Sequence, residues 1–183
     1  VAHLSWQPAT KGMNGGYVDS TNIRYNVTRY PGEQVVATQQ ADTTFTETLP
    51  NEAMKVYSYA VVALNDTMKS EPVTSNKVAG GSAFDIPFSE DFSNDDDFNL
   101  FTVLDLGGSG SWNMSLQNVR IFHFSGQSND WLITPPIKLK KGKTYNVSCV
   151  ASPGYSSAPD ALQILVGQRT DTVGYSEVVP KTA

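Results

Sequence analysis

Hydrophobic and polar residues alternate along several short stretches of the first 78 residues. The clearest stretch is Val56–Leu64, in which Tyr57, Tyr59 and Val61 share one face of an extended chain. Turn signals such as Pro31-Gly32 separate the stretches. The pattern predicts strands in the segment before Pro8 and at Ile23–Tyr30, Val35–Thr38, Thr43–Thr48, Val56–Leu64 and Val73–Val78.

The second half of the chain alternates over shorter stretches. No stretch of ten or more residues shows the 3.6-residue apolar spacing of a helix, so the predicted fold class is all-β. Short strands at this spacing, separated by turns, are typical of β-sandwiches, and we expect two of them in tandem. The strands predicted here are Phe101–Leu106, Val119–Phe124, Trp131–Thr134, Tyr145–Ala151 and Leu162–Val166.

A short run of small residues divides the two halves. Ala79–Ala83 has the sequence AGGSA, which is typical of a flexible linker. The composition then turns acidic in Phe84–Asn99. We therefore expect one domain at residues 1–79, a linker at 80–84 and a second domain at 85–183.

The alternation also predicts which side chains form the cores. Cys149 shares a face with Tyr145 and Val147, so we expect it to be a small buried hydrophobe. As the single cysteine, it cannot form a disulfide framework. The aromatic residues expected in the two cores are Trp6, Tyr25, Tyr57 and Tyr59 in the first domain, and Phe92 and Trp131 in the second.

Composition narrows the classes of partner. The net charge of −5 argues against nucleic acid, because binding phosphates needs a basic stripe. The one basic segment, Lys138–Lys143, is typical of a solvated strand-to-strand turn. No apolar run reaches the ~18 residues that a membrane span requires. The chain opens directly on a predicted strand without a signal peptide, and we expect a mature or trimmed fragment.

Few residues could carry catalysis, and we predict that the chain is not an enzyme. His3 and His123 lie on separate predicted strands, and we expect both to be structural or surface residues. The Gly107–Ser111 segment ends on Ser where a nucleophile elbow needs Gly. One cysteine and two distant histidines also make no zinc cluster. A carboxylate pair for glycoside hydrolysis would have to be assembled by the fold, and the acids here cluster in loops, where they are usually solvated.

The first 79 residues resemble a fibronectin type III domain. The resemblance rests on Leu4-Ser5-Trp6 with Pro8, on Tyr25 with Val27, and on Leu49 before the Tyr57–Ala63 strand. It implies an immunoglobulin-like sandwich whose first strand would lie upstream of Val1. The corner between Leu49 and Tyr57 is longer than is usual in that family, and the chain has no Arg-Gly-Asp tripeptide.

Residues from Ile86 to about Gln168 are similar to the cleaved-adhesin or choice-of-anchor jelly-roll family. The matching order is Phe88–Phe92, then Trp112 after a Gly-rich turn, then Asp130–Pro135, followed by Leu139, Gly142 and Tyr145. These modules are similar to MAM-type sandwiches and occur, without catalytic activity, in large secreted or surface proteins of bacteria. The family is usually longer, so we expect this second domain to be incomplete.

These resemblances imply a non-catalytic recognition or adhesion module that is exported or displayed at a cell surface. Its ligand would be a glycan or a protein. The alternative is an accessory segment of a larger secreted protease or glycoside hydrolase, with the active site on another domain.

Two sets of residues are candidate sites. The resemblance places a structural calcium at Glu90, Asp91 and Asp130, and loop carboxylates are the ligands that calcium prefers. Trp112 and Tyr155 lie in loops and could contact a ligand, although packing under their own loops is the other reading. The sequence also contains four N-glycosylation sequons, whose use depends on the host: Asn26, Asn65, Asn113 and Asn146.

Overall fold

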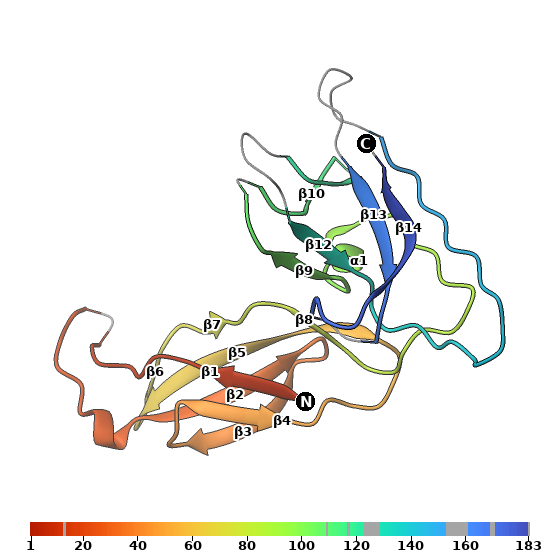
Figure 1. Cartoon of the computed structure of the whole chain (residues 1–183). Coiled ribbons are helices and arrows are strands. Elements are labelled where there is room, and N and C mark those ends of the chain that lie inside the picture. Colours follow the sequence, from red (N-terminus) through yellow and green to blue (C-terminus); the bar gives the residue numbers. More distant parts are fainter. Residues whose placement is uncertain are drawn as a thin grey trace.

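The computed structural model describes residues 1–12, 14–108, 110–116, 118–122, 129–152, 161–168 and 171–182. Within this part the chain is all-β, as predicted, and its one α-helix is the single turn α1 (Asp95–Phe98) (Figure 1). The first half contains β1 (Ala2–Ser5), a 3-10 turn (Ser20–Asn22), β2 (Arg24–Tyr30), β3 (Gln34–Gln40), β4 (Thr44–Glu47), β5 (Lys55–Asn65), β6 (Met68–Lys69), β7 (Val73–Thr74) and β8 (Val78–Gly80). The second half contains β9 (Thr102–Asp105), β10 (Asn113–Ser115), β11 (Asn118–Arg120), β12 (Asp130–Ile133), β13 (Leu162–Val166) and β14 (Ser176–Thr182).

Two antiparallel sheets build the first half. The larger sheet has the order β3-β2-β5-β6, and β7 and β8 also pair with β5. Strands β2 and β5 pair without interruption from Arg24 opposite Leu64 to Tyr30 opposite Ser58. The smaller sheet pairs β1 with β4. Long, regular pairing of this kind holds the alternating side chains in register, so that one face of each strand can be buried.

The core of the first half lies between these two sheets. Ala2 from β1 clusters with Val27, Tyr57 and Tyr59 from β2 and β5. Tyr25 and Ile23 are also buried, and Trp6 packs against the cluster with its ring 5.4 Å from that of Tyr25. The predicted aromatic core of the first half is therefore confirmed, with Trp6 at its half-buried margin.

The described residues of the second half form three separate strand pairs: β9 with β12, β10 with β11, and β13 with β14. The β9–β12 pair runs from Asp105 opposite Asp130 to Thr102 opposite Ile133. A chain of half-buried rings links the loop before α1 to the residue that precedes β9. The ring centroids in this chain lie 5.0 Å apart for Phe84 and Phe88, 6.5 Å for Phe88 and Phe101, and 4.9 Å for Phe92 and Phe101.

Trp131 and Phe92, which the sequence assigned to the core of the second half, are both half-buried. The Trp131 ring stands edge-on to Tyr175 at 5.3 Å. Gly167 makes room for Tyr175, because a side chain at Gly167 would place its Cβ 2.7 Å from that ring. Aromatic contacts thus do much of the packing in this half.

The prediction for Tyr145–Ala151 is wrong. The segment forms no strand, and Val150 on it is fully exposed. Cys149, expected to be buried, is exposed as well. Alternation alone does not make a strand, because its backbone groups also need a partner strand for their hydrogen bonds.

The predicted strand Val119–Phe124 is shorter in the structure. Strand β11 ends at Arg120, and positions 123 and 124 lie outside the described residues. The single strand predicted at Val73–Val78 is wrong, because the structure has two short strands there, β7 and β8, with no strand between them. The short strands β6 and β10 and the longer β14 were not predicted.

The segment expected to be a flexible linker is held against the first half. Gly80 and Ala79 pair with Lys55 and Val56 through β8. The amide of Ser82 then donates to the carbonyl of Glu52 at 2.7 Å. Gly81 adopts a φ of 131°, and a Cβ there would lie 2.8 Å from Cα of Met54. The small residues here allow close backbone packing. From composition alone, the same residues predict a flexible linker.

In the described part of the chain, no helix combines the length and apolar character needed to cross a lipid bilayer.

Candidate functional site

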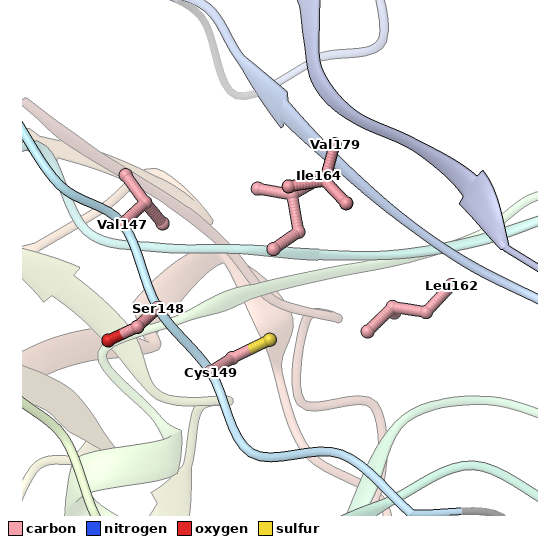
Figure 2. A pocket seen from close by; sticks show the side chains of 6 residues that line it. All are labelled: Val147, Ser148, Cys149, Leu162, Ile164 and Val179. Carbon is pink, nitrogen blue, oxygen red and sulfur yellow. The ribbon is translucent and has the colours of Figure 1, made fainter.

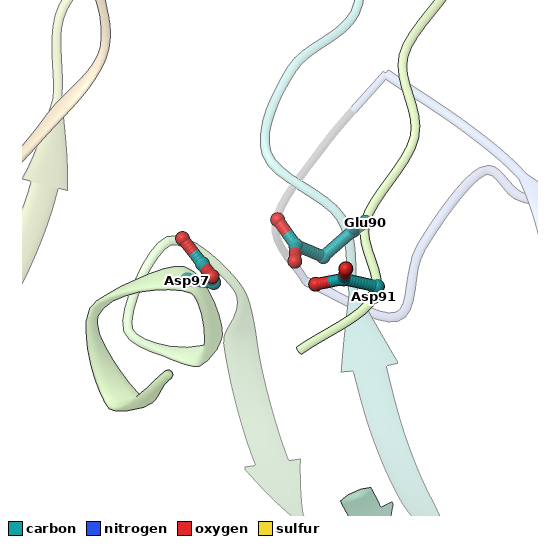
Figure 3. A group of neighbouring side chains, drawn as sticks. All are labelled: Glu90, Asp91 and Asp97. Atoms are coloured by element: carbon teal, nitrogen blue, oxygen red, sulfur yellow. The ribbon is translucent and has the colours of Figure 1, made fainter. Parts of the chain in front are cut away.

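Three carboxylates gather where the acidic segment begins the second half. One oxygen from each of Glu90, Asp91 and Asp97 lies within 4.8 Å of the others. Figure 3 shows Glu90 and Asp91 together on one segment, with Asp97 facing them from α1. We call these three residues the acidic group. It is the one place in the described residues where three acids come this close.

Local hydrogen bonds fold the acidic group. Oε1 of Glu90 accepts the amide of Phe92 at 2.8 Å, and Oδ1 of Asp91 accepts the amide of Ser93 at 3.0 Å. The Asn94 side chain caps α1 by accepting the amide of Asp97 at 3.0 Å. Asn is a favoured N-cap, and acidic residues suit the first turn of a helix, so the sequence itself forms this turn.

The acidic group could hold a hard cation through its oxygens. Calcium takes six to eight oxygen ligands, so three carboxylates would supply part of a site and leave the rest to carbonyls or water. Such groups also occur on protein surfaces without an ion.

The third predicted metal residue, Asp130, is not part of the acidic group. Asp130 begins β12, opposite Asp105 on β9. The third carboxylate of the acidic group is that of Asp97, which the sequence had not indicated as a ligand. Asn94 is a recognisable N-cap residue, and such a cap brings the amide of Asp97, and with it the Asp97 side chain, back toward the preceding loop. The cap could therefore have indicated that Asp97 lies near Glu90 and Asp91.

The two predicted ligand-contacting aromatics are placed differently by the structure. Trp112 is half-buried, and its indole N–H donates to the carbonyl of Asp130 at 3.1 Å. This bond holds Trp112 against the start of β12. Tyr155 lies outside the described residues.

Among the described residues, neither His3 nor Cys149 belongs to the group of side chains close enough to share a metal ion. His3 is on β1, where its ring shares an exposed 3.2 Å contact with the hydroxyl of Thr46 on β4. His123 lies outside the described residues. Figure 2 shows the Cys149 side chain directed toward Leu162 and Ile164, across a shallow groove of about 270 Å³ that is also lined by Val179.

A small hairpin in the loop between β1 and β2 exposes an aromatic ring. Lys11 and Tyr17 form an antiparallel bridge, and the amide of Gly12 donates to the carbonyl of Gly16 at 2.9 Å. The amide of Gly15, with φ at 76°, donates back to the carbonyl of Gly12 at 2.8 Å. Tyr17 is 93% exposed at this turn. We call residues 11, 12 and 14–17 the Tyr17 hairpin; no periodic pattern predicts it, because glycine-rich loops have no periodicity.

A second cleft lies between the two halves. It has a volume of about 480 Å³ and is lined from the first half by residues at the ends of β2 and β5 and from the second half by α1. Lys77 before β8 and Asp96 on α1 both line it, and their side chains form an ion pair at 2.8 Å. We call it the inter-half cleft. No local sequence pattern predicts it, since residues more than 60 positions apart form it.

Charged and polar side chains in the first half form a network between its two sheets. Arg29 is buried on the same face of β2 as Tyr25 and Val27. It pairs with Glu47 and donates to Gln34, and its guanidinium lies 5.7 Å from the centre of the Tyr57 ring. The Tyr59 hydroxyl donates to the other oxygen of Glu47 at 2.9 Å.

This network alters the acidity of its members. Burial, with the hydrogen bond to Glu47, raises the pKa of Tyr59 well above its usual value. Burial also raises the pKa of Tyr57, whose hydroxyl lies 3.3 Å from Glu52. The hydrogen bond from Lys55 lowers the pKa of Glu52. Both phenols are therefore held protonated, which suits structural donors better than acid–base catalysts at neutral pH.

Comparison of the chain with protein-family models, with curated proteins and with solved structures returned no match. The resemblances to fibronectin type III and cleaved-adhesin modules thus rest on the residues alone.

Proposed function

We propose that this chain is a non-catalytic recognition or adhesion module that acts outside the cell and binds a glycan or a protein. We also infer that its halves are two β-sandwiches in tandem, fibronectin type III-like and then jelly-roll-like. The core between two sheets in residues 2–80 supports the first of these.

The Tyr17 hairpin is the observation that carries the proposal. Tyrosine is enriched at binding hot spots because it offers a large amphipathic surface with few rotatable bonds. The backbone hydrogen bonds that join Gly12 to Gly16 and Gly15 to Gly12 hold the turn in place, so little backbone freedom would be lost on binding. Neighbouring Asn14 and Thr10 add hydrogen-bonding groups to the same loop.

The test begins with a glycan array and a pull-down from extracellular extract, using the full chain. For any ligand found, Tyr17→Ala should weaken binding about 30-fold, as expected for a hot-spot residue. Leu116→Ala is the matched control, because Leu116 is also highly exposed at a turn between two strands. Absence of any glycan or protein ligand would contradict the recognition function. A ligand that binds the Tyr17→Ala variant with unchanged affinity would show that the Tyr17 hairpin is not the binding site.

We further propose that Glu90 and Asp91 contribute to a structural calcium site, with Asp97 as their partner. The closeness of the three carboxylates supports this. Bound calcium would neutralise them and tie the loop before Phe92 to α1. Millimolar calcium should then raise the melting temperature, because a ligand that binds the folded state stabilises it.

The variant Asp97→Asn should abolish that rise, and Asp85→Asn, outside the acidic group, should keep it. An unchanged melting temperature of the unmodified chain across the calcium titration would overturn the calcium proposal.

The accessory-segment hypothesis shares these properties but places the chain beside a catalytic domain. The domains flanking this chain in the full-length protein distinguish the two. An adjoining peptidase or glycosidase favours the accessory role, and further sandwiches with a sorting tail favour adhesion.

A further inference from the structure

The inter-half cleft combines apolar and polar walls within a small volume. Met54 and Val56 come from the start of β5, and Leu100 follows α1 from the opposite side. Tyr30 at the end of β2 adds an aromatic ring. Apolar and aromatic surfaces of this kind can contact the C–H faces of a ligand without demanding hydrogen bonds.

The charges on its walls balance. Lys55 and Lys77 line the side formed by the first half, and Asp96 and Asp97 line the side formed by α1. Lys77 is paired with Asp96 at 2.8 Å, and Lys55 with Glu52 at 3.0 Å. Each of the two lysines is thus paired with a carboxylate, so the cleft offers no unpaired ammonium group that would select an anion. It does present hydrogen-bond donors and acceptors side by side.

The dimensions favour a small ligand over a protein surface. Small-molecule sites usually enclose about 300–1,000 Å³ and lie preferentially between domains. The volume of about 480 Å³ falls in that range. A stable protein–protein contact instead covers roughly 800 Å² on each partner. A ligand that is neutral, rich in hydroxyl groups and apolar on its ring faces matches the walls best.

We propose that the inter-half cleft is a binding site for a short, neutral oligosaccharide. Tyr30, Met54 and Leu100 would contact the ring faces, while Lys77 and Asp96 would bind hydroxyl groups. This rests on the proposed recognition function and assigns it a site and a class of ligand, independent of the Tyr17 hairpin.

Amide chemical shifts of the ¹⁵N-labelled full chain provide the test. The neutral probes are tetrasaccharides of cellulose, amylose, xylan and chitin, and tetragalacturonate is the anionic probe. At least one neutral probe should shift the amides of Ser58, Lys77 and Leu100. Lys77→Ala should weaken that binding about tenfold, since a hydrogen bond from a charged group is lost.

The control is Lys138→Ala. Lys138 pairs with Asp85 at 3.2 Å on the surface of the second half, outside the cleft. This variant loses the same kind of exposed ion pair and should bind normally, which separates a ligand contact from a general effect of charge. Both variants should keep the amide spectrum of a folded chain, because both lysines are exposed.

Each other outcome overturns the cleft site. Binding with shifts confined to the Tyr17 hairpin would leave the recognition function standing and remove the cleft from it. Binding of tetragalacturonate alone would contradict the neutral ligand. Binding that Lys77→Ala and Lys138→Ala weaken equally would show a nonspecific charge effect. If no probe binds, the oligosaccharide site fails, and the recognition function then depends on its protein ligand.

Discussion

The two halves of the chain bury their side chains to very different extents, although both consist of strands. In the first half Val27 is fully buried, and Tyr57 and Tyr59 are each 2% exposed. In the described part of the second half, Ile133 and Pro135 are the only buried residues. The first half has a strand pair seven residues long inside a large sheet, whereas the second has separate pairs. An alternating pattern of hydrophobic and polar residues thus produces a buried core only where long strand pairing lets one sheet cover another.

The halves also differ in how they use polar groups. The first half buries Arg29 and Glu47 as a pair with Tyr59, while the second packs half-buried aromatic rings against one another. A buried pair of charges ties the two sheets together only while both partners are present. This difference can be measured residue by residue.

The largest expected effect comes from Glu47→Ala. It leaves the Arg29 guanidinium buried without its counter-charge and removes the acceptor of the Tyr59 hydroxyl. We expect the free energy of unfolding, measured in urea, to fall by about 3–5 kcal/mol. Glu71→Ala, at an exposed position of the same half, should change it by less than about 0.5 kcal/mol. Equal effects of the two substitutions would contradict a stabilising role for the pair formed by Arg29 and Glu47.

A smaller effect is expected from Val27→Ala. It removes two methyl groups from the centre of the core and leaves a cavity, so unfolding should become about 2–3 kcal/mol easier. Val150→Ala makes the same change at a fully exposed position of the second half and should be neutral within about 0.5 kcal/mol. Thermal melts of the two variants check this. A destabilising Val150→Ala would indicate that the 145–151 segment is buried after all.

The smallest effect at neutral pH is expected from Tyr59→Phe. It removes one hydrogen bond to Glu47 and should cost about 1 kcal/mol. The pKa of Tyr59 is raised in the folded state, so its contribution is complete below its ordinary pKa of 10.0 and is lost as the pH rises further. Urea unfolding of the unmodified chain should therefore become easier above about pH 10, and Tyr59→Phe should flatten this dependence.

Tyr17→Phe is the matched control, because its ring is exposed, and it should leave the alkaline limb unchanged. A wild-type stability that does not fall in alkali, while the chain stays folded, would contradict the role of the buried phenol.

The sequence predicted the all-β class and the strands of the first half well, and physical reasons explain why. In β2 and β5 the alternation coincides with the actual burial, so periodicity marks both the strand and its inner face. Arg29 follows the same alternation and is buried with Tyr25 and Val27. In Tyr145–Ala151 the same alternation has no partner strand in the structure, and there the prediction fails. Strand β14 contains Pro180, a residue that argues against a strand in a sequence pattern.

The candidate sites were less predictable. Glu90 and Asp91 were proposed from a family resemblance, but their neighbour in space is Asp97, which the Asn94 cap brings to them. That cap is a local signal and could have been read. The exposure of Tyr17 and the inter-half cleft depend on how distant segments pack. No pattern among neighbouring residues in the sequence predicts either of them.

Gly81 determines how the molecule can be dissected. With β8 paired to β5 and Val78 opposite Tyr57, a fragment that ends at residue 77 would lose a strand next to the best-buried ring of the first half. The cut belongs after Ser82. Variant libraries of the junction should also keep Gly81 fixed, because any side chain there would collide with the backbone of Met54 and Ala53. The junction between the halves is thus closely packed, and changes in its length should alter the shape of the inter-half cleft more than the structure of either sheet.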